Sequence, residues 1–396
     1  MSWIKHTGCT YHTQDTGYYC GGAAAMMVLR EIGVPYADLD QDDLYASNHA
    51  HNAKSGWYTD PYGLRYTLVD RKPASFANTF VVHKPITEAE GTRDIVYTLH
   101  RYGVSPAVLV YGCMHWIVVP GVQTDVEPVG APTDYVVEGF WIHNPVHHAT
   151  APPPPHDAAD GCGSGGTLGN ANDFVTYAGW QSTYFTGCNY DDPGGSLQYI
   201  SVCDPDKRDI ELPKRRPRKA LASGRKLITQ DDAVKFGQLG LEEYGLLKDE
   251  RVAAAIKGAQ PTRPMPVLRL DRPNTYYYLV PWETQRGVAA LAQIDARFGV
   301  FQGLHLRNKP SLEEYLPKRE IIRRVSNRQF DLPEKLGRLV LHPEVACLSP
   351  TLVWRPCWES FSPYMPFYQF TVGDFRIYVR VDGEVFSALT TVGSGV

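Results

Sequence analysis

The chain has 396 residues, of which 43% are hydrophobic and 21% charged, a composition that excludes disordered, collagen-like and coiled-coil proteins. No stretch reaches the roughly 18 to 20 apolar residues that a membrane span needs, and the first residues lack the apolar core of a signal peptide. We therefore expect a cytoplasmic protein without membrane contact. Eight cysteines without a CxxC pair predict reduced thiols and no four-cysteine zinc site.

The net charge of −4 is unevenly distributed along the chain. Residues 1–203 hold 9 Lys and Arg against 20 Asp and Glu, a net charge of −11, whereas residues 204–396 hold 30 against 23, a net charge of +7. This asymmetry favours either separate partners or two domains that dock on each other within one molecule.

A polar, basic and proline-punctuated segment, residues 204–226, separates two regions with regular hydrophobic patterns. We therefore predict a first domain at 1–203, a linker at 204–226 and a second domain at 227–396. The basic run could also bind nucleic acid, but no aromatic platform accompanies it, so we interpret it as a solvated linker and expect no nucleic-acid partner.

The first region begins with three predicted helices. CGGAAAMMVLREIGVP predicts a helix at about 21–31 that is apolar on most sides and should therefore be buried centrally. TDPYGLRYTLVDRK and TEAEGTRDIVYTLHRYG predict two shorter helices, and Thr87 and Glu90 could form a capping box at the start of the second.

The pattern then changes to short β-branched and aromatic runs bounded by Gly and Pro. PAVLVYG, MHWIVVPGV, YVVEGFWIHNPV, TYFTG and LQYISV predict antiparallel strands. Helices followed by a sheet indicate the α+β fold class. Gly161, Gly163 and Gly166 formally match a dinucleotide-binding pattern, but neither a strand before them nor a helix after them can be drawn, so no cofactor is expected.

The stretch QDTGYYCGGAAAMM contains a candidate nucleophile. It places Cys20 in the first turn of the buried helix, where unpaired backbone N–H groups and the helix dipole favour a thiolate. Gln14 lies six residues earlier on an approach loop, from which its amide could donate to a developing oxyanion beside Cys20.

A thiolate nucleophile needs a proton carrier, and His115 interrupts an otherwise apolar predicted strand. A buried imidazole needs a partner, and we propose Asn144, at the end of the next predicted strand, to fix its tautomer and orientation. The order Gln, Cys at a helix start, His in a strand and Asn before Pro is more specific than any of these residues alone.

With these four residues, the stretch from about Tyr11 to Tyr190 resembles the papain-like cysteine peptidases, in particular the compact bacterial branch similar to bacteriocin-processing and staphopain-type peptidases. The matching positions are Gln14, Cys20, His115 followed by Trp, and Asn144. Two departures from the family pattern are Gly22, where Pro or Ser is frequent, and Tyr19, where Trp is frequent; neither removes a catalytic group. The resemblance implies a papain-like domain, a central buried helix packed on an antiparallel sheet, followed by a second α+β domain.

The resemblance also implies a cysteine peptidase that hydrolyses peptide or isopeptide bonds without a metal or cofactor. Cys20 would attack the carbonyl, His115 would protonate the leaving amine, and Gln14 with the Cys20 backbone N–H would hold the oxyanion. The same groups could serve an acyltransferase or a deamidase, and a catalytically silent papain-like binding module is a further alternative.

Other side chains offer competing interpretations. Cys113 lies two residues before His115 and could be the thiol that meets the imidazole. Cys188 and Cys203 could pair, although two free core thiols fit a cytoplasmic protein better. The histidines at 143, 147, 148 and 156 could bind a transition metal, but loop histidines without a carboxylate or cysteine spacing are more often solvated, so no metal is expected.

The second region predicts a binding or regulatory module. RPNTYYYLVPWE and GVAALAQIDARFGVFQGLHL predict strand pairs, SLEEYLPKREIIRRV predicts a basic helix, and DFRIYVRVDGEVFSAL predicts a hairpin whose tight turn contains Asp382 and Gly383. We expect this module to dock on the first domain and to limit access to Cys20, and the expected partner of the whole protein is a peptide or protein substrate.

Overall fold

The computed structural model describes residues 2–129, 134–146, 170–205, 209–215, 219–311, 315–331, 338–341 and 349–390. The chain divides into two compact units. The first is Met1–Lys219 with Gln302–Leu304, and the second is Ala220–Phe301 with His305–Thr391. Both units combine helices with mostly antiparallel strands, so the predicted α+β class is confirmed.

Four main helices form in the first unit: α1 at Cys20–Glu31, α2 at Gln41–Ala50, α3 at Pro61–Arg71 and α4 at Glu88–Tyr102. Three of them were predicted, and α2 was not. Shorter turns are η1 at Tyr36–Asp38, α5 at Tyr177–Gly179 and η2 at Trp180–Tyr184. The segment TYFTG, predicted as a strand, instead begins within η2, so that prediction was wrong.

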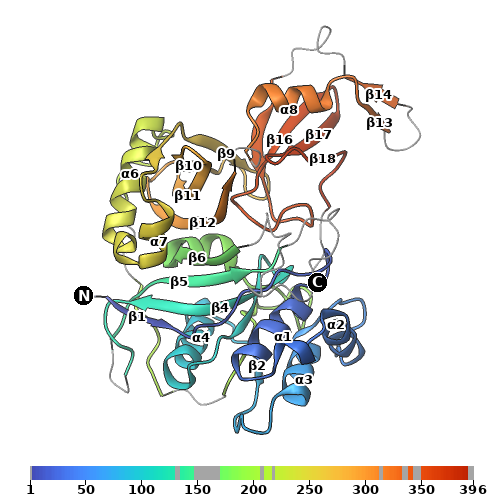
Figure 1. Cartoon of the computed structure of the whole chain (residues 1–396), viewed down its shortest axis with the longest axis vertical. Coiled ribbons are helices and arrows are strands. Elements are labelled where there is room, and N and C mark those ends of the chain that lie inside the picture. The colour runs from blue at the N-terminus through green and yellow to red at the C-terminus, as the bar shows by residue number, and fades with distance from the viewer. Residues whose placement is uncertain are drawn as a thin grey trace. The chain divides into compact units, whose positions relative to one another are not determined.

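The first helix is the centre of the unit, as its apolar pattern predicted. Every residue of α1 from Cys20 to Leu29 is buried. The helix packs against strand β4, at His115–Thr124, and against α2 and α3 (Figure 1). An apolar surface on all sides therefore corresponds to neighbours on all sides.

The strands of the first unit form an antiparallel sheet in the order β6-β5-β4-β3-β7-β2, with β1 paired to β4. Their bounds are β1 Trp3–His6, β2 Val81–His83, β3 Ala107–Val110, β5 Val137–Asn144, β6 Asn170–Thr176 and β7 Ser201–Cys203. The hairpin of β3 and β4 pairs Val110 with His115, and β5 returns beside β4. This arrangement brings the start of β4 next to the end of β5.

The second unit has its strands in the order β18-β17-β16-β15-β9-β10-β11-β12, with β8 beside β10 and a separate β13-β14 pair. The bounds are β8 Gln260–Pro261, β9 Met265–Arg269, β10 Tyr276–Thr284, β11 Gly287–Asp295, β12 Phe301–Ser311, β13 Gln329–Asp331, β14 Arg338–Val340, β15 Thr351–Trp354, β16 Phe367–Val372, β17 Phe375–Arg380 and β18 Val385–Phe386. Strands β9 and β15 run parallel. In Figure 1, the labelled strands β9 to β12 and β16 to β18 can be traced in this order.

Its helices are α6 at Gln230–Glu243, η3 at Leu246–Lys248, α7 at Glu250–Ala255 and α8 at Lys318–Val325. Helix α6 packs on β10 and β11, and α8 covers apolar side chains of β16 and β17. The predicted basic helix and the predicted hairpin are both present, and Gly383 has a φ of 95° in the hairpin turn.

The segment predicted as a solvated linker is hydrogen-bonded in its described parts. Ile210 is buried, and the backbone N–H of Lys214 donates to the Tyr135 carbonyl at 2.9 Å. Further along, the N–H of Leu221 donates to the carbonyl of Phe298 at 2.8 Å. Most of the described residues of this segment are nevertheless exposed, and its first part belongs to the first unit and its last part to the second.

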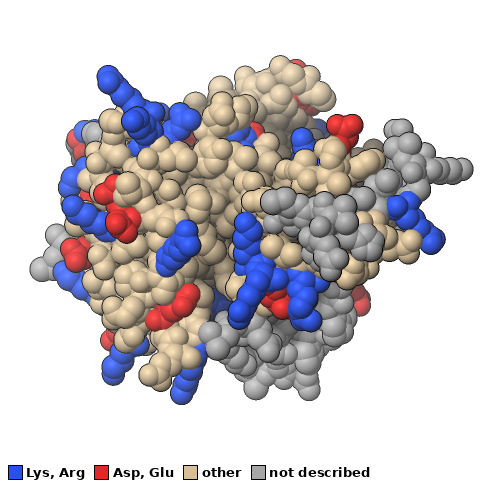
Figure 2. Space-filling view, turned by 90° about the horizontal axis from the view of Figure 1, so that it is seen from above, with Lys and Arg blue, Asp and Glu red and all other residues tan. Residues whose placement is uncertain are grey.

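On the face drawn in Figure 2, Lys and Arg side chains are interspersed with Asp and Glu among uncharged residues. Such mixing of signs is ordinary for a globular surface. None of the helices in the described residues is long and apolar enough to span a bilayer.

Candidate functional site

The candidate nucleophile Cys20 is the first residue of α1, and the carbonyl of Tyr19 accepts the first bond of the helix from Ala23 at 2.9 Å. The next residue is a glycine, Gly21, because another chain segment lies against the start of the helix. A Cβ atom on Gly21 would lie 2.4 Å from the side chain of Thr59, closer than real contacts allow. The glycine therefore allows Thr59 to pack beside Cys20.

The start of β4 also lies against the start of α1. The indole Nε1 of Trp116 donates to the Thr59 carbonyl at 3.0 Å, and Thr59 packs against Gly21, the residue after Cys20. Because Trp116 follows His115 directly, this contact brings the candidate base to the end of α1 that carries Cys20.

The predicted contact between His115 and Asn144 is present. Nε2 of His115 lies 2.9 Å from Oδ1 of Asn144, across the first residue of β4 and the last residue of β5. An amide oxygen only accepts, so Nε2 carries the proton and donates it. In that tautomer Nδ1 holds the lone pair and is the nitrogen that can accept a proton from a thiol.

The segment that carries Gln14 is bound to the residue after Asn144. The backbone N–H of Gln14 donates to the Pro145 carbonyl at 2.7 Å, and its side-chain Nε2 donates to the Thr16 carbonyl at 2.7 Å. One of the two Nε2 protons is thus used locally, and the other remains for an oxyanion. The structure therefore brings the segments of all four predicted site residues together.

A residue that was not predicted from the sequence holds this segment in place. Gln41, at the start of α2, donates from Nε2 to the Thr13 carbonyl at 2.8 Å and accepts from the Asp15 N–H at 3.1 Å. These two bonds bracket Gln14 on both sides. A glutamine at a helix start carries no signal in the sequence, because its partners are backbone groups of a distant loop.

Burial dominates the electrostatics of the site. Only 1% of Cys20 and none of His115 is exposed. Burial raises the pKa of the Cys20 thiol to about 12, although the backbone N–H groups of Trp116 and Gly21 oppose this rise. Burial likewise lowers the pKa of His115 to about 4, against the effect of Asn144.

Burial of Cys20 therefore opposes the thiolate that the helix start was expected to favour. Desolvation of a charge in a dry interior outweighs the helix dipole. At neutral pH the site holds a neutral thiol and a neutral imidazole.

Beside the site lies a tyrosine cluster that was also not predicted. Tyr19 stacks on Tyr45 with ring centres 4.4 Å apart, and Tyr18 stacks on Tyr58 at 5.1 Å. Tyr18 and Tyr19 precede Cys20 directly, and Tyr58 precedes Thr59. The signal in the sequence is the pair of tyrosines before the cysteine.

The competing thiol is not free, because Cys113 forms a disulfide with Cys188. The expectation of reduced thiols at both positions is therefore wrong, and so is the alternative in which Cys113 is the thiol that meets the imidazole. The alternative pairing of Cys188 with Cys203 is also wrong, since the Cys203 thiol donates to Ser201 Oγ at 3.1 Å. A buried disulfide is typical of oxidising compartments and weighs against the cytoplasmic prediction.

The alternative of a histidine metal cluster concerns four positions, of which only His143 lies within the described residues. Its Nε2 lies 2.9 Å from the carbonyl of Cys9, and its Nδ1 accepts from the N–H of Asn172 at 3.1 Å. Both ring nitrogens therefore have protein partners. The other members, at positions 147, 148 and 156, and the glycines 161, 163 and 166 lie outside the described residues.

Comparisons with known proteins add little to this geometry. No protein-family model and no curated protein matches the chain. A similar solved structure is the C-terminal domain of YpeB from Bacillus megaterium, with 11% sequence identity over 78% of this chain and 100% of that chain. The TM-score of 0.17 is too low for this likeness to inform fold or function.

Proposed function

We propose that the chain is a papain-like cysteine peptidase that hydrolyses peptide or isopeptide bonds, with Cys20 as nucleophile, His115 as acid and base, and Asn144 as the residue that orients the imidazole. The observation that carries this proposal is the 2.9 Å contact between His115 and Asn144, on the strand whose next residue, Trp116, is hydrogen-bonded to Thr59 beside the start of α1. A helix-start thiol beside an oriented imidazole is an arrangement used for nucleophilic catalysis.

In the first half of the reaction, the thiol proton of Cys20 passes to Nδ1 of His115 as the sulfur attacks the substrate carbonyl. The oxyanion that forms accepts hydrogen bonds from the backbone N–H of Cys20 and from Nε2 of Gln14. His115 then gives its proton to the leaving amine, and a thioester remains.

In the second half, His115 takes a proton from water, whose oxygen attacks the thioester. Collapse of the second oxyanion breaks the C–S bond, releases the acid and returns the proton to Cys20. An amine in place of water would make the same site an acyltransferase, and a glutamine side chain as substrate would make it a deamidase.

A second candidate, a catalytically silent papain-like binding module, is favoured by one specific observation. Cys20 and His115 are almost fully buried, and their pKa values are moved apart so that both are neutral. Catalysis by this pair requires a substrate-induced opening that admits the scissile bond, whereas a binding module requires none.

The test exposes the protein to a peptide library and identifies products by mass spectrometry. We expect cleavage by the wild type and by Cys203→Ser, a control at another buried thiol, and none by Cys20→Ala. His115→Ala should abolish turnover, and Gln14→Ala should lower it by roughly 10- to 1000-fold. Asn144→Ala should be milder than His115→Ala.

Labelling distinguishes the two candidates. A peptidyl electrophile, whose peptide part can open the site, should modify Cys20 faster than iodoacetamide does. Equal and slow labelling by both reagents, together with the same activity in Cys20→Ala, would instead support the binding module. Two further expectations remain predictions: that the second region docks on the first and limits access to Cys20, and that the substrate is a peptide or protein.

A further inference from the structure

The turn between β3 and β4 ends directly at His115 and has an unusual backbone. Its residues Tyr111, Gly112 and Cys113 have φ angles of 56°, 72° and 64°, all in the left-handed region. Residues other than glycine rarely adopt this region, because their Cβ atoms crowd the following carbonyl. Two of the three, Tyr111 and Cys113, are not glycine, so contacts from outside the turn are needed to hold them.

Those contacts come from residues 184–188. The disulfide joins Cys113 to Cys188, and the backbone N–H of Tyr111 donates to the Tyr184 carbonyl at 2.8 Å. The first of these contacts is covalent and lies two residues before His115. The turn that begins β4 is therefore tied to a separate segment of the chain.

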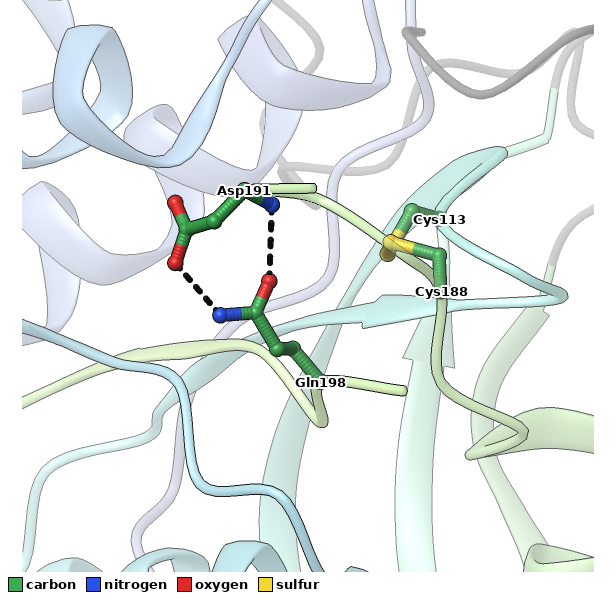
Figure 3. Close-up of a disulfide and its surroundings, with 4 residues drawn as sticks. All are labelled: Cys113, Cys188, Asp191 and Gln198. Atoms are coloured by element: carbon green, nitrogen blue, oxygen red, sulfur yellow. Dashed lines mark hydrogen bonds between the residues drawn. A yellow bond between two sulfur atoms is a disulfide. The ribbon is translucent and has the colours of Figure 1, made fainter. Parts of the chain in front are cut away.

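That segment is itself anchored, as Figure 3 shows. Cys188 and Gln198 exchange backbone hydrogen bonds of 3.0 and 2.7 Å. The side chain of Gln198 accepts from the Asp191 N–H at 2.9 Å and donates to the Asp191 carboxylate. Lys84 adds an ion pair to Asp191 at 2.7 Å. The disulfide thus connects the turn to a loop that is itself held by hydrogen bonds and an ion pair.

The turn also contacts the imidazole through Tyr111. This ring is almost parallel to that of His115, with centres 6.4 Å apart, and it contacts Tyr184 at 5.2 Å. A shift of the turn would therefore move both the backbone at which His115 begins and the ring beside the imidazole.

We propose that the Cys113–Cys188 disulfide is a positioning element for His115, so that the site works only with this pair oxidised and Cys20 reduced. The inference rests on the proposed function in that it assigns His115 as the base. Reduction would free the left-handed turn to relax, and His115 would lose its fixed geometry towards Cys20 and Asn144.

The switching step is a thiol–disulfide exchange. Cys188 is 7% exposed and Cys113 is fully buried, so a dithiol reductant attacks the sulfur of Cys188 and displaces Cys113 as a thiolate, which takes a proton. The second thiol of the reductant then displaces Cys188 and closes its own disulfide. Two electrons and two protons pass from the reductant to the cysteine pair.

The experiment compares the full-length protein before and after reduction of this pair. Dithiothreitol is applied until mass spectrometry after alkylation finds thiols at both positions, and the reductant is then removed. We expect kcat to fall at least roughly tenfold while KM changes less than about twofold, since geometry at the reacting atoms is lost and peptide binding is kept. Reoxidation by oxidised glutathione should restore kcat.

Two variants provide controls. Cys203→Ser removes a buried thiol of the same unit and should respond to reduction as the wild type does. The double variant Cys113→Ser with Cys188→Ser should have the low kcat of the reduced protein whether or not dithiothreitol is present. Should the double variant fail to fold, the chemically reduced wild type gives the same comparison. An unchanged kcat on reduction would overturn the inference.

A second readout does not depend on activity. In protein labelled with ¹⁵N-histidine, the ring signals of His115, assigned by their loss in His115→Gln, should report a protonated Nε2 in the oxidised protein and should broaden or shift on reduction. If neither form cleaves any peptide but these signals change, the proposed function fails and the positioning inference stands. If peptides are cleaved equally and the signals stay unchanged, the inference alone fails.

Discussion

At the scale of single residues, His115 makes the stability of the protein depend on pH in the acidic range. The folded protein lowers its pKa from 6.5 to about 4, because a charged imidazole has no access to water. Below pH 6.5 the unfolded chain therefore binds a proton that the folded protein does not. Stability from this residue is present above that pH and is lost as the pH falls towards 4.

We predict that wild type loses stability relative to His115→Gln on acidification. A difference of 2.5 pKa units corresponds to about 3 kcal/mol between pH 7 and pH 4. Urea unfolding of both proteins across this range measures the difference. Comparison with the variant is needed because Asp94, whose pKa burial raises to about 7, has the opposite pH dependence in both proteins. A difference that does not vary with pH would show that the imidazole is hydrated.

The contact between His115 and Asn144 could be predicted from the sequence, whereas the disulfide could not. A polar residue within an apolar strand needs a partner, and adjacent strands limit where that partner can be. Cys113 and Cys188 are 75 residues apart and meet through a turn and a loop. Residue spacing carries no signal for such a contact, and the low density of cysteines predicted reduced thiols instead.

At the scale of elements, periodicity predicted α1, which buries a wide apolar surface, and missed α2, which does not. Helix α1 is buried from Cys20 to Leu29, and its sequence is apolar throughout that span. Helix α2 buries only Gln41, Leu44 and Asn48, two of which are polar. Its start is set by Asp40, whose carboxylate accepts from two backbone N–H groups of the first turn. An aspartate cap without an apolar stripe behind it did not suffice to predict the helix.

Helix α2 is connected to the site by the polar side chain of Gln41, which binds the backbone on both sides of Gln14. Replacing Gln41 with Ala removes both bonds that bracket Gln14, so the oxyanion donor should lose its fixed position. We expect kcat to fall roughly 10- to 100-fold, with KM changed much less. Steady-state kinetics on a peptide cleaved by the wild type measures both constants.

The control for Gln41→Ala is Asp43→Ala, on the same turn of α2 with an exposed side chain, which should change kcat less than about twofold. Gln41→Ala combined with Gln14→Ala should be no slower than Gln14→Ala alone, because the first residue acts through the second. Fully multiplicative losses in the double variant would contradict this role.

At the scale of the whole molecule, composition predicted a basic segment between two regions but not the packing around that segment. The basic, proline-rich segment has few apolar residues and therefore resembled a solvated linker. One of them, Ile210, is nevertheless buried, and Lys214 pairs with the segment at Tyr135 before β5. A few separate buried residues, Asp204, Ile210 and Pro213, and one backbone pairing leave no periodic pattern, so the sequence could not have revealed them.

The last prediction compares two shortened chains, 1–219 and 1–203. Both lack Gln302–Leu304, which belongs to the first unit, so this loss cancels in the comparison. Only the shorter chain also loses the burial of Ile210 and the Lys214 hydrogen bond, which should lower its free energy of unfolding by about 2 to 4 kcal/mol. Urea unfolding followed by tryptophan fluorescence measures this difference, and Ile210→Ala in the longer chain should reproduce most of it. Equal stability of the two chains would instead support the end of the first domain at residue 203.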